Sequence, residues 1–287
     1  MTQTLLFACD LSAENRAAFA RALRLASEQG ARLDVIHVLD PYLPRRVLHD
    51  LEEAVVADMQ AMLTDIREDY ALPEPQMLLQ TVAGSPYAEI IREAHEREVD
   101  MIVLGAHRKR GQPDLVAGTT LARVLRSAPC PVLTVSHLAS QEWRDILVPV
   151  DFSLTSRHTL RETLKRFPEA RLTLLHAWDI PGERELGSNG DYARWRDREV
   201  ARLRTQLERE TEQLMAELDR VPELDRVPEL ELVLEQGDPL EVLMTRLRRQ
   251  PPDLLALGSR GQLGRQSHIT EQLLAEPHCD IMLCRAW

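Results

Sequence analysis

The sequence is poor in the features that mark nucleic-acid-binding proteins. Acidic residues outnumber basic ones by 46 to 35. A protein that coats nucleic acid needs a basic surface to neutralise phosphates. The aromatic content of 4% is also low for a surface that stacks bases. The net charge of -11 therefore argues against a nucleic-acid partner.

Long apolar runs and cysteine pairs are missing as well. No stretch approaches the roughly 20 apolar residues that span a bilayer. The N-terminus has an apolar run only from Leu5 to Cys9 and no basic region before it, unlike a signal peptide. The four cysteines show no ligand or redox spacing such as C-x-x-C. We expect a cytoplasmic protein with buried thiols, no membrane partner and no metal.

What the sequence does contain is an internal repeat. Five landmarks recur in the same order: Asp10 and Asp151, each in Asp-x-Ser after an apolar run; His37 and His176; Gly84 and Gly237, each in Gly-x-Pro; Gly105 and Gly258; Cys130 and Cys279. The polar stretch 136–144 separates the copies. We predict one domain over residues 1–139 and a second over 140–287.

Apolar runs alternate with helical patterns in each copy. The runs are continuous, as expected for parallel strands covered on both faces. Ser12 and Ser153 are candidate N-caps of the helices that follow the first strands. Strand–helix alternation predicts an α/β fold of two tandem doubly wound domains, each a five-stranded parallel sheet flanked by helices.

A long charged helix follows the second strand of each copy. We expect these helices over residues 45–70 and 192–219, and the third strands over residues 76–82 and 231–235. Five apolar positions recur along the second helix: Val200, Leu203, Leu207, Leu214 and Leu218. The default expectation is that they face their own sheet, and a partner-binding face is the alternative.

Candidate binding residues lie after the first and fourth strands, because ligands of such sheets bind beyond the carboxyl ends of the strands where the strand order reverses. Asp10 and Asp151 follow the first strands. A glycine-containing loop from Gly105 to Thr120 follows the fourth strand of the first copy. Its glycines and the start of the next helix suit a phosphate, and Thr119 either caps that helix or contacts the phosphate.

Both copies resemble the universal stress protein domain, through the Asp-x-Ser strand end, the second strand with its histidine, the Gly-x-Pro and the Pro-Cys-Pro-Val-Leu tail. The ATP-binding branch of that family carries a loop of pattern G-x2-G-x9-G-(S/T). Gly105 and Gly118-Thr119 match it, but Arg108 replaces its second glycine. The second copy has Ser267-His268 in place of the final pair and a loop four residues shorter.

The resemblance implies a Rossmann-like fold of the adenine-nucleotide-hydrolase type, with ATP or another adenine nucleotide in the first domain only. Asp10 and the backbone of Val38 would hold the nucleoside. The residues of the phosphate loop would be Gly105, Arg108, Gly111, Gly118, Thr119 and Thr120. Arg108 either blocks the close approach of a phosphate or pairs with it. We expect Asp151 and the two histidines to have structural roles.

The function implied by the resemblance is a non-enzymatic stress-response protein that acts as a binding or scaffold module. Two alternatives stay open: a slow ATP hydrolase, for which Asp10 and Asp114 are the only candidates for Mg²⁺ and water positioning, and an interaction protein independent of nucleotide. The resemblance also implies that the fifth strands, residues 132–136 and 281–284, pair and form an internal pseudo-dimer, since each would otherwise be an exposed apolar edge. A homodimer of whole chains and an unidentified protein partner also stay open.

Overall fold

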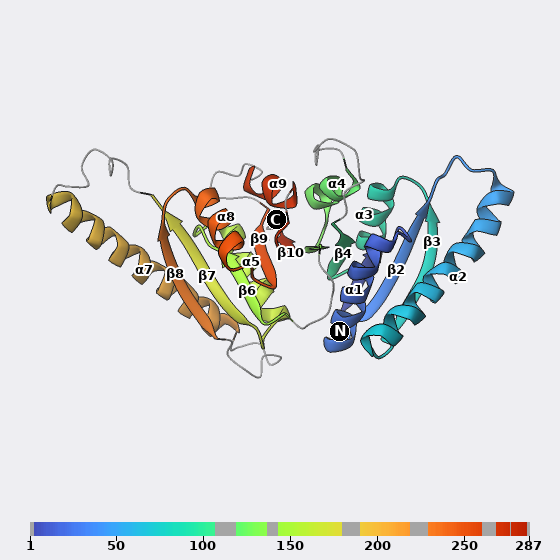
Figure 1. The fold of residues 1–287 in the computed structure, drawn as a ribbon, viewed down its shortest axis with the longest axis horizontal. Coiled ribbons are helices and arrows are strands. Elements are labelled where there is room, and N and C mark those ends of the chain that lie inside the picture. The colour runs from blue at the N-terminus through green and yellow to red at the C-terminus, as the bar shows by residue number, and fades with distance from the viewer. Residues whose placement is uncertain are drawn as a thin grey trace. The chain divides into compact units, whose positions relative to one another are not determined.

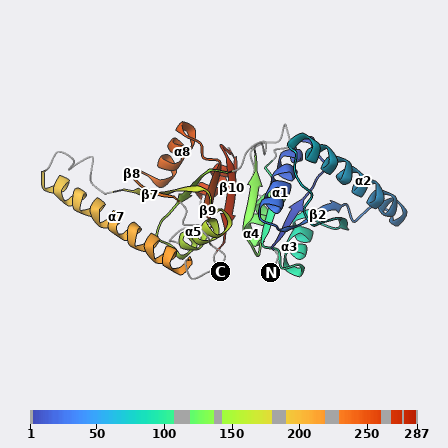
Figure 2. The ribbon, with the colours of Figure 1, turned by 90° about the horizontal axis from the view of Figure 1, so that it is seen from below.

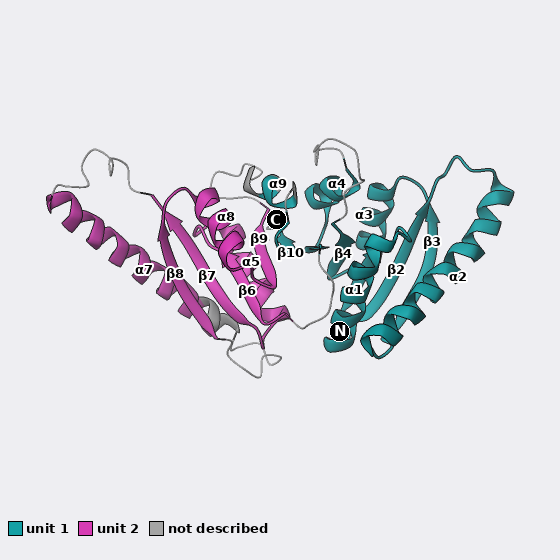
Figure 3. Cartoon of the chain, viewed as in Figure 1, with its two compact units in different colours: residues 1–142, 270–285 teal, residues 143–269, 286–287 magenta. Residues whose placement is uncertain are grey.

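The structure is a computed structural model that describes residues 3–106, 119–136, 143–179, 190–218, 229–259, 268–275 and 277–285. The chain divides into two compact units (Figure 3). The first contains residues 1–142 and 270–285, and the second contains residues 143–269 and 286–287. The last strand of the second sequence copy thus belongs to the first unit. The predicted domain boundary at residues 139 and 140 lies outside the described residues.

Five parallel strands form the sheet of the first copy, in the order β3-β2-β1-β4-β5 (Figure 1). Their bounds are β1 (Thr4–Ala8), β2 (Arg32–Leu39), β3 (Met77–Ala83), β4 (Met101–Gly105) and β5 (Val132–Val135). A sixth strand, β10 (Asp280–Cys284), lies antiparallel to β5. Leu5, Leu6 and Phe7 of β1 are fully buried, which is why the run is continuously apolar rather than alternating.

Helices cover both faces of this sheet. They are α1 (Arg16–Glu28), which follows a 3-10 turn η1 (Ala13–Asn15), and then α2 (Arg45–Tyr70), α3 (Pro86–Glu96) and α4 (Thr120–Ser127). Helix α1 packs with α2, and α3 packs with α4 on the opposite face (Figure 2). The predicted doubly wound α/β architecture is confirmed, and the long helix begins and ends where the sequence indicates.

The second unit repeats this arrangement. Strands β6 (Asp145–Pro149), β7 (Arg171–Trp178), β8 (Leu230–Gln236) and β9 (Leu254–Gly258) are parallel in the order β9-β6-β7-β8. The helices are α5 (Leu154–Arg166), α7 (Gly190–Leu218) and α8 (Pro239–Arg249). A further helix, α9 (His268–Ala275), is assigned to the first unit from Thr270 onward. Among the described parts of the chain, no helix is long and apolar enough to cross a membrane.

The two predicted serine caps are confirmed. The Ser12 hydroxyl accepts a hydrogen bond from the backbone N–H of Asn15 (3.2 Å), and the Ser153 hydroxyl accepts one from that of Ser156 (3.1 Å). Each hydroxyl satisfies an N–H that the first turn of a helix leaves without a partner. Gly30, with φ +58°, follows α1 and ends it in the left-handed conformation that glycine adopts without strain.

Helix α7 bears out part of the expectation for its apolar positions. Leu207 is buried, and Val200 and Leu203 are half-buried. The side chains of Leu214 and Leu218 lie outside the described residues. The described positions therefore support a helix that packs on its own unit rather than a free partner-binding face.

Candidate nucleotide-binding edge

The carboxyl ends of β1 and β4 lie side by side in the first unit. The two strands pair in parallel, with Phe7 opposite Val103. β1 is followed by Asp10 and β4 ends at Gly105. Strand order reverses between these two strands, since β2 and β3 lie on one side and β5 on the other. This is the position at which an open α/β sheet binds its ligand.

Asp10 forms a tight turn at this edge. Its Oδ1 accepts hydrogen bonds from the Ser12 backbone N–H (3.0 Å), the Ser12 hydroxyl (2.7 Å) and the Asn15 side-chain amide (2.9 Å). Leu11, between Asp10 and Ser12, has φ +59°. A non-glycine residue in the left-handed region is strained by about 1–2 kcal/mol, and such strain is concentrated at functional sites.

Asn15 is a site residue that sequence reasoning missed. It is 2% exposed, and its amide nitrogen donates to the Ala8 carbonyl (3.3 Å) as well as to Asp10. Its Oδ1 is buried, and none of the residues that the structure describes donates a hydrogen bond to it. The only signal in the sequence is its position, five residues after the aspartate. In the second copy Ser156 takes this position. Because the two copies differ here, the repeat does not indicate a shared role for Asn15.

The structure describes some of the other predicted site residues but not all of them. Val38 is half-buried in β2 opposite Val82, and Gly105 is at the end of β4 opposite Val135. Thr119 caps α4, since its hydroxyl accepts a hydrogen bond from the Ala122 N–H (3.2 Å). Thr120 is the exposed first residue of that helix. Arg108, Gly111 and Gly118 lie outside the described residues, as does Asp114.

His37 supports the end of β1. Its Nδ1 lies 2.8 Å from the Cys9 carbonyl oxygen, so this nitrogen carries the proton and donates. The Cys9 N–H in turn donates to the Ile36 carbonyl (2.8 Å). Burial raises the pKa of the Cys9 thiol to about 11. A thiol with that pKa is protonated at neutral pH and is a poor nucleophile. The hydrogen bond from His37 ties the end of β1 to β2.

The second unit has the same backbone devices at β6. Asp151 Oδ1 accepts a hydrogen bond from the Ser153 N–H (3.0 Å), and Phe152 has φ +61°. His176 Nδ1 lies 2.7 Å from the Val150 carbonyl, and its ring packs on Phe152 with centroids 4.6 Å apart. The histidine and the strained turn are thus shared by both copies.

Gly258, at the end of β9, is required by helix packing. A Cβ at this position would lie 2.7 Å from the Thr155 methyl carbon of α5. That distance is far inside van der Waals contact, so only glycine fits. In the second copy this glycine is therefore explained without any phosphate.

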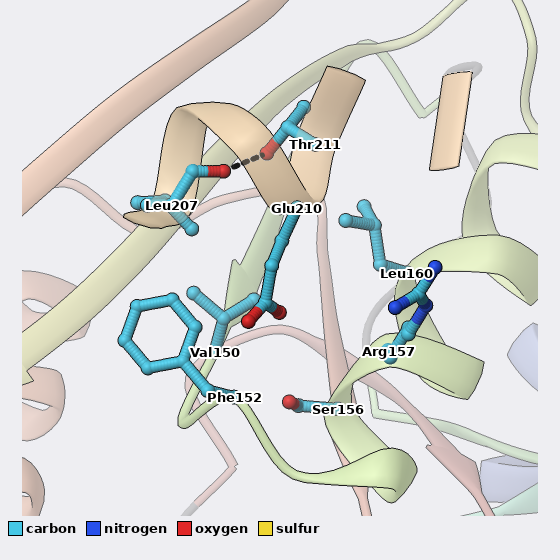
Figure 4. A pocket seen from close by; sticks show the side chains of 8 residues that line it. All are labelled: Val150, Phe152, Ser156, Arg157, Leu160, Leu207, Glu210 and Thr211. Carbon is cyan, nitrogen blue, oxygen red and sulfur yellow. Dashed lines mark hydrogen bonds between the residues drawn. The ribbon is translucent and has the colours of Figure 1, made fainter. Parts of the chain in front are cut away.

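A small cavity lies between α5 and α7 in the second unit (Figure 4). The side chain of Glu210 points into it toward Phe152 and Ser156, with Leu207 and Thr211 on the same helix. Its volume of about 10 Å³ accommodates about one water molecule. It cannot hold a nucleotide. In the described part of the chain no three His, Cys, Asp or Glu side chains gather as metal ligands would.

Comparison with known proteins gives a consistent result. Over 140 residues the chain is 28% identical to Universal stress protein A homolog 1 of Coxiella burnetii, a match that covers 46% of this chain and 94% of that protein. Over 144 residues it is 33% identical to a universal stress protein of Thermus aquaticus, which covers 47% of this chain and 99% of the relative. Each relative thus corresponds to about half of this chain.

The fold of the whole chain is similar to a solved universal stress protein from Archaeoglobus fulgidus, with a TM-score of 0.67, 18% identity and 98% of both chains covered. The sequence profile of the Universal stress protein family matches twice, over residues 1–136 and 142–285. These two matches span nearly the whole chain, so this protein belongs to the universal stress protein family and carries the domain of that family twice.

Proposed function

We propose that this tandem universal stress protein binds one adenine nucleotide, at the β1–β4 edge of its first unit, and acts as a stress-response binding module rather than as an enzyme. The observation that carries the proposal is the Asp10 turn, in which three donors and a strained Leu11 hold one carboxylate beside the end of β4. The adenine nucleotide is inferred from the resemblance of the loop at Gly105 and Gly118-Thr119 to the ATP-binding pattern of the family.

Two features support binding without hydrolysis. Asp10 Oδ1 already accepts three hydrogen bonds from its own loop, which favours a positioning role over that of a general base. The Thr119 hydroxyl is engaged as the cap of α4. What remains at that helix start for a phosphate is backbone N–H groups and the positive end of the helix dipole, which bind an anion but do not activate water.

The first experiment is ATP binding by calorimetry with a matched pair of variants. Asp10→Ala removes the turn in the first unit, and Asp151→Ala removes the equivalent carboxylate in the second. We expect Asp10→Ala to weaken binding by about tenfold or more, the loss of a charge-assisted contact, and Asp151→Ala to leave it within about twofold. Equal effects of the two variants would place the nucleotide elsewhere.

The loop is tested separately. Gly118→Val should weaken binding, because a side chain there blocks the close approach of a phosphate. Arg108→Gly restores the family pattern and should bind at least as tightly as the natural chain. Phosphate release is measured in the same samples. Release in the natural chain that disappears in Gly118→Val would support the hydrolase instead, and no ATP binding at all would support the nucleotide-independent alternative.

A further inference from the structure

The junction of β5 and β10 is made by more than a backbone ladder. Thr134 pairs with Ile281, and the Thr134 hydroxyl donates a hydrogen bond to the Ile281 carbonyl (3.2 Å). Just beyond β5, the Ser136 hydroxyl donates to the Cys279 carbonyl (3.0 Å), and the Ser136 N–H donates to Asp280 Oδ1 (3.0 Å). The prediction that the two fifth strands lie side by side is confirmed, and one side chain of β10 is a carboxylate.

That carboxylate is part of a buried ion pair. Asp280 Oδ2 lies 3.5 Å from Nε of Arg21, which comes from α1, 259 positions earlier in the chain, and the two side chains are only 3% and 6% exposed. A buried ion pair adds little net stability compared with an apolar pair of similar volume, but removal of one partner is severely destabilising because a charge stays buried. In some proteins such pairs serve to favour one structural pairing over its alternatives.

The repeat shows that the two copies do not have the same charged residues at these two positions. The spacing from Asp10 to Asp151 places Glu162 at the position of Arg21, and the spacing from Cys130 to Cys279 places Pro131 at the position of Asp280. Glu162 pairs instead with Arg166, one turn along its own helix (3.0 Å). The first copy supplies the cation and no carboxylate, and the second copy supplies the carboxylate and no cation.

We propose that Arg21 and Asp280 make the edge of β5 selective for the last strand of its own chain and unsuited to a second copy of β5. If two β5 strands paired in the same register, Pro131 would replace Asp280, and the buried Arg21 would lose its carboxylate. If two β10 strands paired, Asp280 would face the position of Glu162, which carries the same charge. Both like-with-like pairings are penalised, and only the β5–β10 pairing satisfies the charges.

The first test is hydrogen exchange, read by mass spectrometry, on the full-length chain. Arg21→Met and Asp280→Leu each leave one buried charge, and we expect exchange of the β5 and β10 amides to accelerate about a hundredfold or more. The double variant has an apolar pair in the same place and should return to within about tenfold of the natural chain. Arg166→Met is the matched control, a buried arginine of the second unit, and should leave these two strands unchanged.

Two results would overturn the proposal at this stage. One is a β10 that stays as protected in Asp280→Leu as in Arg166→Met, which would mean that the pair does not hold the strand. The other is a double variant no better protected than the single variants, which would show that the two charges do not act together.

The second test measures selectivity with strand peptides. Met282→Pro in the full-length chain interrupts β10, because proline has no N–H to donate, and leaves the β5 edge open. We expect a peptide of residues 277–285 to bind this edge at least tenfold more tightly than a peptide of residues 128–136 or the Asp280→Asn form of the first peptide. The further change Arg21→Met should remove that difference.

Equal binding of the 277–285 and 128–136 peptides would overturn the proposal, and so would a difference that persists after Arg21→Met. The hydrogen-exchange test needs no proline and decides the matter alone if Met282→Pro does not fold. Neither test involves a nucleotide, so the result is independent of the proposed ATP site.

Discussion

The two copies have the same hydrogen-bonded turn and cap after the first strand, but they bury different polar side chains. Both have a strained turn after the first strand, a serine cap and a histidine on the preceding carbonyl. In the first copy Asp34, 1% exposed on β2, pairs with Arg97 (2.7 Å), and Arg97 also pairs with the buried Glu93 (2.7 Å). Burial lowers the pKa of Arg97, but the hydrogen bonds and the negative charges of Asp34 and Glu93 together outweigh burial, so this pKa lies above its usual value.

The second copy has no such carboxylate at the same place. The repeat spacing puts Thr173 at the position of Asp34 and Gln250 at that of Arg97. Its α5 helix instead buries hydroxyls: Thr159 and Thr163, fully buried, donate to the carbonyls four residues earlier (2.8 Å each). The equivalent α1 positions are Ala18 and Ala22. The hydroxyls of Thr159 and Thr163 are therefore satisfied within the helix. The fold therefore constrains backbone geometry and side-chain volume but leaves the polarity of the interior free to diverge between the two copies.

Among the substitutions that test this difference between the copies, Asp34→Ala should cause the largest loss of stability. Asp34→Ala removes the carboxylate that two arginines share, Arg32 (2.6 Å) and Arg97, and should destabilise the first unit by about 2–3 kcal/mol. Thr173→Ala, the matched change in the second unit, should cost less than about 1 kcal/mol. Hydrogen exchange in β2 and β7 during a urea titration separates the two units. A cost for Asp34→Ala no larger than that for Thr173→Ala would contradict the view that the first copy depends on its buried charges.

A smaller effect is expected at Gly258. Gly258→Ala forces its Cβ against the Thr155 methyl group and should destabilise the second unit by about 1–3 kcal/mol, as overpacking does. Thr155→Ser removes that methyl group and should recover part of the loss, whereas Thr163→Ser, two turns further along α5, should not. A Gly258→Ala chain as stable as the natural one in urea would show that the glycine is not explained by this contact.

The shared histidines should give effects of equal size. His37→Phe and His176→Phe each deprive a strand-end carbonyl, that of Cys9 or Val150, of its ring N–H donor. We expect each change to cost about 1–2 kcal/mol in its own unit, the usual result when a polar group loses its hydrogen bond. Measured unit by unit in urea, costs that differ by more than a factor of about two would contradict the view that this device serves both copies alike.

The sequence predicts the features of this molecule that depend on local pattern. The five repeated landmarks, continuous apolar strands and serine caps are enough for the doubly wound fold and the bounds of α2, whereas the pairing of the fifth strands was implied by the resemblance to the family. The positive φ of Leu11 and Phe152 was not predictable, because leucine and phenylalanine disfavour that conformation and only the Asp-x-Ser hydrogen bonds impose it. The Arg21–Asp280 pair was not predictable either, because its partners are too far apart in the chain for any periodicity to join them.

Some residues of the candidate site are likewise predictable from the sequence, and others are not. Asp10 and Gly105 follow from the rule for strand ends, and the structure brings those ends together. Asn15 does not, because an asparagine at the start of a helix is predicted as a cap, whereas here the side chain reaches back to Ala8 and Asp10. The residues that carry the loop pattern, Arg108 and Gly118, lie outside the described part of the chain, so the contribution of each stays a prediction.

The smallest change near neutral pH is expected for Cys9→Val, which gives the first copy the residue that Val150 supplies in the second. Cys9 is 4% exposed, and a buried thiol behaves as a small apolar group, so the cost should stay below about 1 kcal/mol. The two chains should differ more clearly in how their stability depends on pH. Because folding raises the thiol pKa from its ordinary value of 9.0 to about 11, the natural chain keeps its full stability below pH 9 and loses part of it as the pH rises toward 11. The Cys9→Val chain has no thiol to ionise there and should lose less over that interval. Urea midpoints of both chains at pH 7.5, 9 and 10.5 measure this, and two curves that stay parallel throughout would show that the thiol titrates alike in the folded and unfolded chain.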